Sequence, residues 1–152
     1  MVWVVCKRQM MNDIVNAISK ALYTTFGSDY RYYVEDVEQN LKTPCFTIEL
    51  LEPRMRSRNA QLYDRTVPVV VHYITNNKTS LKKEYYGIAD QILECLEYLN
   101  VNNKIIRGES MSYHIVEDAL QLFVTYKFMT IDENALVIDN AMDEITGNIT
   151  HK

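Results

Sequence analysis

Glycine, proline and cysteine are all scarce in this chain of 152 residues, which has four glycines, three prolines and three cysteines. Because glycine and proline concentrate in turns, their scarcity predicts that most of the chain lies in helices and strands. Cys6, Cys45 and Cys95 are odd in number, far apart and without CxxC spacing. The cysteines therefore indicate neither a disulfide framework nor a zinc site, and they favour a reducing compartment.

Long apolar runs and known targeting patterns are also missing. No stretch approaches the ~18 apolar residues of a membrane span, and the first residues do not have the charge order of a secretory signal. The phosphate-binding motifs GxxxxGK[ST] and GxGxxG are absent. A net charge of −4 argues against a protein that coats nucleic acid with its whole surface.

Residues suited to catalysis or metal binding are few. His114 and Glu117 have an HxxE spacing, but three residues along a strand place them on opposite faces, so they are not expected to share a metal. His72 follows three valines and is predicted to be a core or interface histidine, since no nucleophile motif stands near it. We therefore predict no catalytic residue, no metal ligand and no cofactor, and hence a protein that is not an enzyme.

The hydrophobic pattern predicts two helices and five strands. Apolar residues recur at helical spacing in 12–26 and 80–99, and they alternate or run continuously in 30–34, 45–51, 66–74, 105–116 and 119–131. The chain length suits one domain. We expect an α+β fold with a mainly antiparallel five-stranded sheet packed against two α-helices, in the order α-β-β-β-α-β-β.

The ends of the chain are predicted to lie outside this domain. Met11 directly precedes Asn12, a good helix cap, so we hypothesise that residues 1–10 are an N-terminal extension from an upstream start site. The domain then covers residues 11–131. Residues 132–152 begin with five acids and no base up to Glu144, and an apolar stripe at helical spacing predicts an acidic tail that becomes helical on assembly.

One short segment contrasts with the acidic chain. RMRSRNAQLYDR, residues 54–65, carries Arg54, Arg56, Arg58 and Arg65 against the single acid Asp64, a local net charge of +3 on a predicted loop. It can be a solvated loop, a contact to nucleic-acid phosphates, or a protein contact in which guanidinium groups bind carboxylates. Composition leaves all three open.

A family resemblance emerges from several segments together. MNDIVNAISKAL, EDVEQNLKTPCFTIELLEP, VPVVVHYI, YYGIADQILECLEYL and RGESMSYHIVEDALQLFVTYKF resemble the tail terminator proteins of long-tailed bacteriophages, over about residues 11–131. The resemblance implies a virion protein, assembled in the host cytoplasm, that forms a homo-oligomeric ring of six subunits. That ring caps the head-proximal end of the tail tube, ends its polymerisation and provides the surface for the head connector or stopper, while genomic DNA passes through it.

In that setting we hypothesise an interface at Arg54, Arg56, Arg58, Tyr63 and Arg65, whose arginines pair with carboxylates of a neighbouring subunit or of the tube protein. Three alternatives stay open. The chain can be another head-tail connector or stopper protein, a small nucleic-acid-binding protein that stacks bases on Tyr63, Tyr73 and Tyr113, or an enzyme with a site assembled from distant residues. No membrane partner is expected.

Overall fold

The computed structural model describes residues 2–5, 10–34, 42–76, 81–117 and 119–132. These residues form eight strands and two helices. Their order is β1 (Val2–Val5), α1 (Met10–Phe26), β2 (Arg31–Val34), β3 (Cys45–Leu50), β4 (Arg54–Ser57), β5 (Leu62–Ile74), α2 (Leu81–Glu97), β6 (Tyr98–Val101), β7 (Lys104–Val116) and β8 (Ala119–Asp132).

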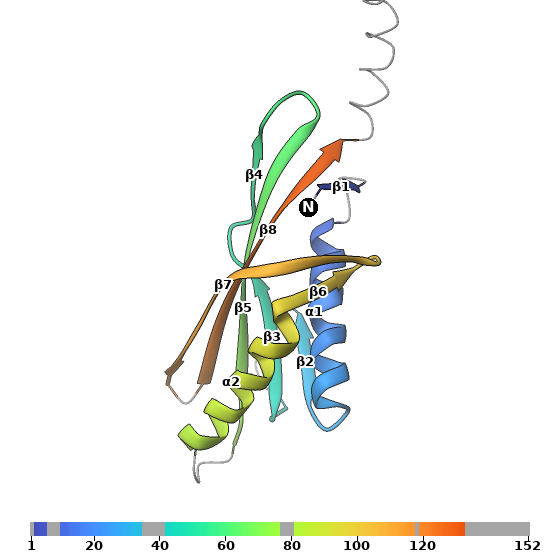
Figure 1. The fold of residues 1–152 in the computed structure, drawn as a ribbon. Helices are drawn as coiled ribbons and strands as arrows, with labels where there is room; N and C mark the ends of the chain where they lie inside the picture. Colours follow the sequence, from blue (N-terminus) through green and yellow to red (C-terminus); the bar gives the residue numbers. More distant parts are fainter. Residues whose placement is uncertain (1, 6–9, 35–41, 77–80, 118, 133–152) are drawn as a thin grey trace, which may run out of the picture.

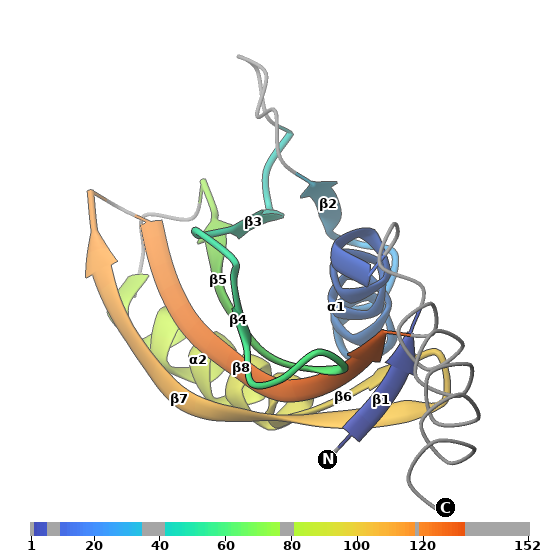
Figure 2. The same ribbon diagram turned by 90° about the horizontal axis from the view of Figure 1, so that it is seen from above.

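The strands form one curled, mixed sheet, so the predicted five-stranded, mainly antiparallel sheet in the order α-β-β-β-α-β-β was wrong. The main path is β2-β3-β5-β8-β7-β6, and β4 and β1 pair with the ends of β5 and β8. The β1–β8 and β2–β3 pairs are parallel, while the other pairs are antiparallel. The long strands β5, β7 and β8 twist along their length, which gives the half-barrel seen from above in Figure 2.

Both predicted helices are present and supply one side of the core. Helix α1 contacts β2 and β3 and also β6, near the opposite end of the strand order, so it lies across the opening of the curl (Figures 1 and 2). The apolar stripes predicted from the sequence face the sheet: Ile14, Ile18 and Leu22 of α1 are fully buried, as are Tyr85 and Ile92 of α2. On the sheet, the core face consists of alternate buried residues: Val67, Val69, Val71 and Tyr73 of β5, and Leu120, Leu122, Val124, Tyr126 and Phe128 of β8.

Strand β5 begins earlier than predicted and is flanked on one side by two different strands. Its second half pairs with β3 and its first half with β4. Pro68 stands between them, and its carbonyl accepts a hydrogen bond from the Leu51 amide at 2.8 Å. Because the N–H and C=O of one strand residue point the same way, the donor that proline lacks would also have faced this side, which is where β3 ends. Proline 68 thus marks the boundary between β3 and β4.

Strand β6 was missed by the sequence analysis. The sequence predicts a helix over residues 80–99, but the helix ends at Glu97, and Asn100 lies within β6. Asn102 and Asn103 have φ values of 52° and 66° and form the two-residue turn between β6 and β7. Asparagine tolerates this left-handed conformation better than most residues, which is why the pair turns the chain here.

The strands predicted over residues 105–116 and 119–131 form a hairpin, since Val116 of β7 pairs with Ala119 of β8. Strand β7 is irregular at its centre, where the register shifts between Gly108 and Ser110. Residues before the bulge pair with β6 and those after it with β8. This change of partner allows the sheet to curl.

The division of the chain into an extension, a domain and a tail stays a prediction. Val2–Val5 form β1 beside the end of β8, and α1 begins at Met10, two residues before the expected cap Asn12. The acidic tail, apart from the backbone of Asp132, lies outside the described residues. Neither α1 nor α2 is long and apolar enough to cross a membrane.

Candidate assembly surface

The arginine segment is a β-hairpin rather than the predicted loop. Arg54–Ser57 form β4, and the returning strand is the first part of β5. The turn is closed by Asn59, whose side-chain oxygen accepts hydrogen bonds from the amides of Gln61 and Leu62, both at 2.8 Å. The Arg58 amide donates to the Leu62 carbonyl at 2.9 Å. Figure 1 shows that the hairpin extends beyond the helices. Its hydrogen-bonded turn makes it an ordered projection and not an irregular loop.

The strand register separates the arginines onto two faces of the hairpin. Arg54 lies opposite Thr66 and Arg56 opposite Asp64, on the face away from the helices. All four residues of β4 are exposed. Neither Arg54 nor Arg56 forms an ion pair with any residue that the structure describes. These two guanidinium groups are therefore presented to solvent as a pair of uncompensated charges.

Arg58 differs because its charge is compensated within the hairpin. Its Nε lies 2.9 Å from Oδ2 of Asp64, and the two side chains are 56% and 38% exposed. A pair this exposed contributes little to stability. It does reduce the net charge that the tip of the hairpin offers to a partner.

Arg65 and Tyr63 lie on the other face, which continues into the core. Arg65 is half-buried, and its Nη1 donates to the sulfur of Met55 at 3.1 Å. Burial lowers the pKa of the Arg65 guanidinium, which nevertheless stays charged at neutral pH. Arg65 lines a groove of about 260 Å³ with Met11, Pro53, Arg54 and Met55. The five predicted interface residues thus share one hairpin but divide between an exposed face and a partly enclosed one.

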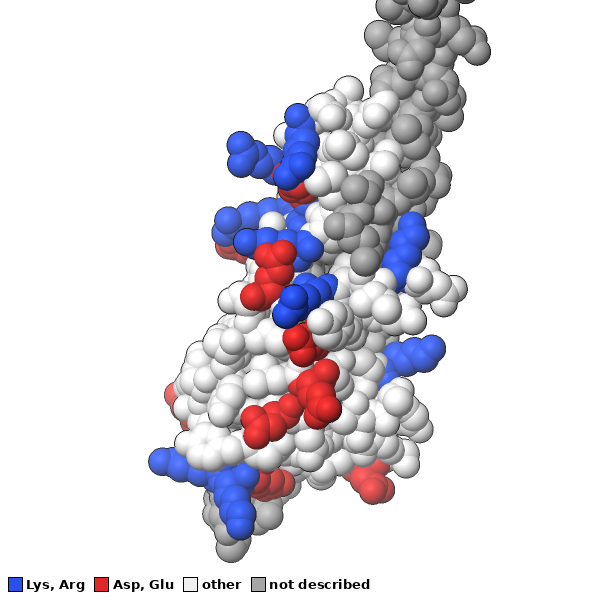
Figure 3. All heavy atoms as spheres, viewed as in Figure 1, with Lys and Arg blue, Asp and Glu red and all other residues white. Residues whose placement is uncertain are grey.

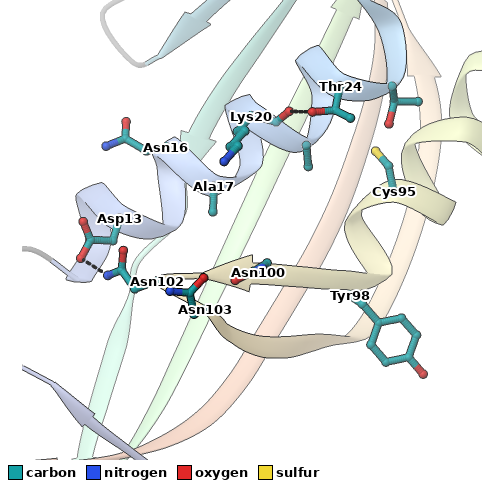
Figure 4. A pocket seen from close by; sticks show the side chains of 12 residues that line it. Asp13, Asn16, Ala17, Lys20, Thr24, Cys95, Tyr98, Asn100, Asn102 and Asn103 are labelled. Carbon is teal, nitrogen blue, oxygen red and sulfur yellow. Dashed lines mark hydrogen bonds between the residues drawn. The ribbon is translucent and has the colours of Figure 1, made fainter.

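A larger groove of about 670 Å³ lies between α1, the end of α2 and β6 (Figure 4). Asn102 crosses one end of this groove and donates from Nδ2 to Oδ2 of Asp13 at 2.9 Å. Cys95 lies at the other end, where burial raises the pKa of its thiol, and the protonated thiol is a poor nucleophile. No histidine lines the groove. Its side chains, which include those of Asp13, Lys20 and several asparagines, can form hydrogen bonds.

Of the described residues, His72 of β5 and His114 of β7 lie on either side of Gln121 of β8, in one row of the sheet. The ring of His114 stacks on Phe123 with centroids 5.3 Å apart, and Glu117 sits in the following turn at φ 48°. His72 is half-buried in β5, where burial lowers the pKa of its imidazole. Within the described ranges, no group of three or more histidine, cysteine, aspartate and glutamate side chains is placed to hold a metal ion.

The tyrosines proposed for base stacking do not form a common surface. Tyr73 is 1% exposed, and its hydroxyl donates to Oε1 of Glu84 at 3.1 Å. Tyr113 forms an edge contact with Tyr86, with ring centroids 6.3 Å apart. Because Tyr73 cannot reach a base, the predicted stacking surface of Tyr63, Tyr73 and Tyr113 is wrong as a set.

The fold and its surface are typical of a protein that makes contact with other macromolecules. A basic hairpin projects from the curled sheet, and such a projection suits contact with another macromolecule. A small-molecule site is instead typically an enclosed cleft. The chain belongs to the phage tail terminator protein family, which it matches over residues 13–136. The family resemblance found in the sequence is thereby confirmed, and the protein is a structural component of a phage tail.

Comparison with other proteins adds little to this assignment. A search of curated proteins found no match. One solved structure resembles the chain with a TM-score of 0.48 and 6% sequence identity, over 84% of this chain and 96% of the other.

Proposed function

We propose that this protein forms a ring, with six subunits, on the head-proximal end of the phage tail tube. The ring ends polymerisation of the tube and provides the surface to which the head connector or stopper attaches. The observation that carries the proposal is the family match, which extends over residues 13–136 and so includes all of α1 except its first three residues, the whole of α2 and the whole arginine hairpin.

Such a ring can stop the growth of the tube without catalysing any reaction. Tube growth continues while each new ring presents the same surface that it has just covered. A ring that binds the tube end with one face and presents a different opposite face does not repeat the tube's own interface, so the next tube subunit finds no matching surface. Complementarity on one face and its absence on the other are sufficient to stop growth.

The arginine hairpin is the proposed site of contact, with Arg54 and Arg56 as its exposed charges. Guanidinium groups bind carboxylates with two parallel hydrogen bonds, and such pairs fix orientation as well as proximity. The projection of the hairpin beyond the helices and its internally bonded turn support this role. The channel of the ring would carry the genomic DNA.

Tail length in a phage that lacks this gene tests the proposal. Negative-stain electron microscopy of lysates is expected to show tails of scattered, excessive length that are not attached to filled heads. Tails of normal length that fail to join heads would instead assign the protein to the connector or stopper class. Normal tails on filled heads would remove both proposals.

A further inference from the structure

We infer that the exposed face of α2 is the docking site for the arginine hairpin of a neighbouring copy of this chain. The inference rests on the proposed ring and names the two surfaces that meet at each subunit boundary. A closed ring needs head-to-tail contacts, in which one surface of a subunit meets a different surface of the next. The hairpin and α2 fulfil that condition.

The docking site is a stripe of four exposed residues spaced four apart in the sequence: Tyr86, Asp90 and Glu94 of α2, and Tyr98, the first residue of β6. The two tyrosines at its ends are 48% and 57% exposed. Tyrosine supplies large, rigid contact area and is enriched at interfaces between proteins. Between the tyrosines, Asp90 and Glu94 form no ion pair with any residue in the described part of the chain.

The position of Glu94, in the last turn of α2, is unfavourable for the helix itself. The last turn of α2 has no basic residue, although the C-terminal end of a helix carries a partial negative charge. Glu97 is compensated by Arg107, with 3.6 Å between Oε1 and Nη2. Glu94 has no ion-pair partner among the described residues, so helix stability does not explain why an acid stands at this position. A cationic partner does.

The spacing of the charges matches across the proposed contact. Arg54 and Arg56 are two residues apart on a strand, so their side chains leave the same face ~6.6 Å apart. Asp90 and Glu94 are four residues apart on a helix, where the rise is ~6 Å. Two guanidinium groups can therefore meet two carboxylates in one orientation.

The arrangement in the monomer requires that the contact lie between copies. In Figure 1 the hairpin is at the upper end of the molecule and α2 at the lower end. Figure 3 shows most lysine and arginine side chains in the upper half of this face, with some acids among them, and an acidic patch lower, over α2, with further basic side chains at the lower end. The hairpin of one subunit can reach only the α2 stripe of another.

Two charge-reversed variants test the inference by exchange of partners. Variant one carries Arg54→Glu and Arg56→Glu, and variant two carries Asp90→Lys and Glu94→Lys. Each variant alone sets like charges against each other at every subunit boundary. In an equimolar mixture, acidic hairpins meet basic stripes and basic hairpins meet acidic stripes, so an even-membered ring of alternating variants restores every contact.

Sedimentation velocity of the full-length chain at low ionic strength measures the association. Each variant alone is expected to associate roughly 10-fold more weakly per contact than the wild type, and the mixture is expected to recover wild-type association. Lys82→Glu with Lys83→Glu is the matched control, because it reverses two exposed charges at the other end of α2 and should leave association unchanged. Circular dichroism confirms that each variant is folded.

Three results would overturn the inference: a monomeric wild-type chain, variants that associate as the wild type does, or a mixture that does not recover. The tail-length experiment separates this inference from the proposed function. Scattered tail lengths in the absence of the gene, combined with an unrecovered mixture, would remove the α2 contact and leave tail termination standing. A recovered mixture with normal tail lengths would do the reverse.

Discussion

Replacing Gly108 with alanine should destabilise the fold through a single steric contact. A Cβ built at Gly108 lies 2.7 Å from Cγ2 of Val124, well inside the ~3.5–4.0 Å of normal carbon contacts. Val124 is fully buried in β8, and a β-branched side chain has few alternative rotamers. The new methyl group can be accommodated only if the β7 bulge or Val124 moves.

The expected cost follows from overpacking in a closed core. Adding a methyl group to a well-packed site typically costs ~1–3 kcal/mol. Gly87 is the matched control, because a Cβ there has no heavy atom within 4 Å and the residue is exposed in the middle of α2. Gly87→Ala should stabilise the protein by up to ~1 kcal/mol, through helix propensity alone. The two substitutions are chemically identical and should act in opposite directions.

Urea denaturation followed by circular dichroism measures both variants. With a slope of ~2 kcal/mol per molar urea, the midpoint for Gly108→Ala should fall by ~0.5–1.5 M at unchanged slope. Adding Val124→Ala to Gly108→Ala should cost less than Val124→Ala costs alone, because the methyl group then enters the space that valine vacates. A Gly108→Ala midpoint equal to that of the wild type, or full additivity of the two substitutions, would refute the reasoning.

Three further outcomes are expected. Tyr126→Phe should lower the free energy of unfolding by ~1–3 kcal/mol, because the buried Tyr126 hydroxyl donates to the Leu96 carbonyl at 2.6 Å. The control is Tyr98→Phe at an exposed position, and equal shifts in melting temperature for the two variants would contradict this expectation. Burial lowers the pKa of His72 from 6.5, so the unfolded chain binds protons more readily than the folded one, and stability should fall as the pH drops below 6.5. His72→Gln should make the free energy of unfolding depend less steeply on pH in denaturation at several pH values. An unchanged pH dependence counts against this expectation. Arg58→Ala should change the urea-derived stability by less than ~0.5 kcal/mol, and a larger loss would show that its ion pair supports the hairpin.

The two helices illustrate what could be predicted from sequence. Helical periodicity is a local property, and burial of an apolar stripe needs only some apolar partner. The stripe that includes Tyr85, Ile88 and Ile92 therefore identified both the helix and its buried face. The β7–β8 hairpin was predictable for the same reason, since its strands are adjacent in sequence and alternate clearly.

The candidate site was located by its composition, but its geometry was not. Four arginines in twelve residues stand out in an acidic chain. The sequence did not reveal that Arg58 is paired with Asp64 or that Arg65 faces away from Arg54, because both depend on the register between β4 and β5. The segment also lacks the apolar alternation of a half-buried strand, since all of β4 is exposed, and so it was mistaken for a loop.

The sequence by itself therefore determined the helices, the longest hairpin, the family and the place of the uncompensated arginines. Tertiary structure alone decided the strand order, the two parallel pairs, the small strands β1 and β6 and the curl of the sheet. A helix satisfies its backbone hydrogen bonds within itself, whereas a strand takes its partners from other strands, which can be distant in the sequence. A short strand such as β1 is a strand because a neighbour is present, and that neighbour, β8, is brought to it by the whole fold.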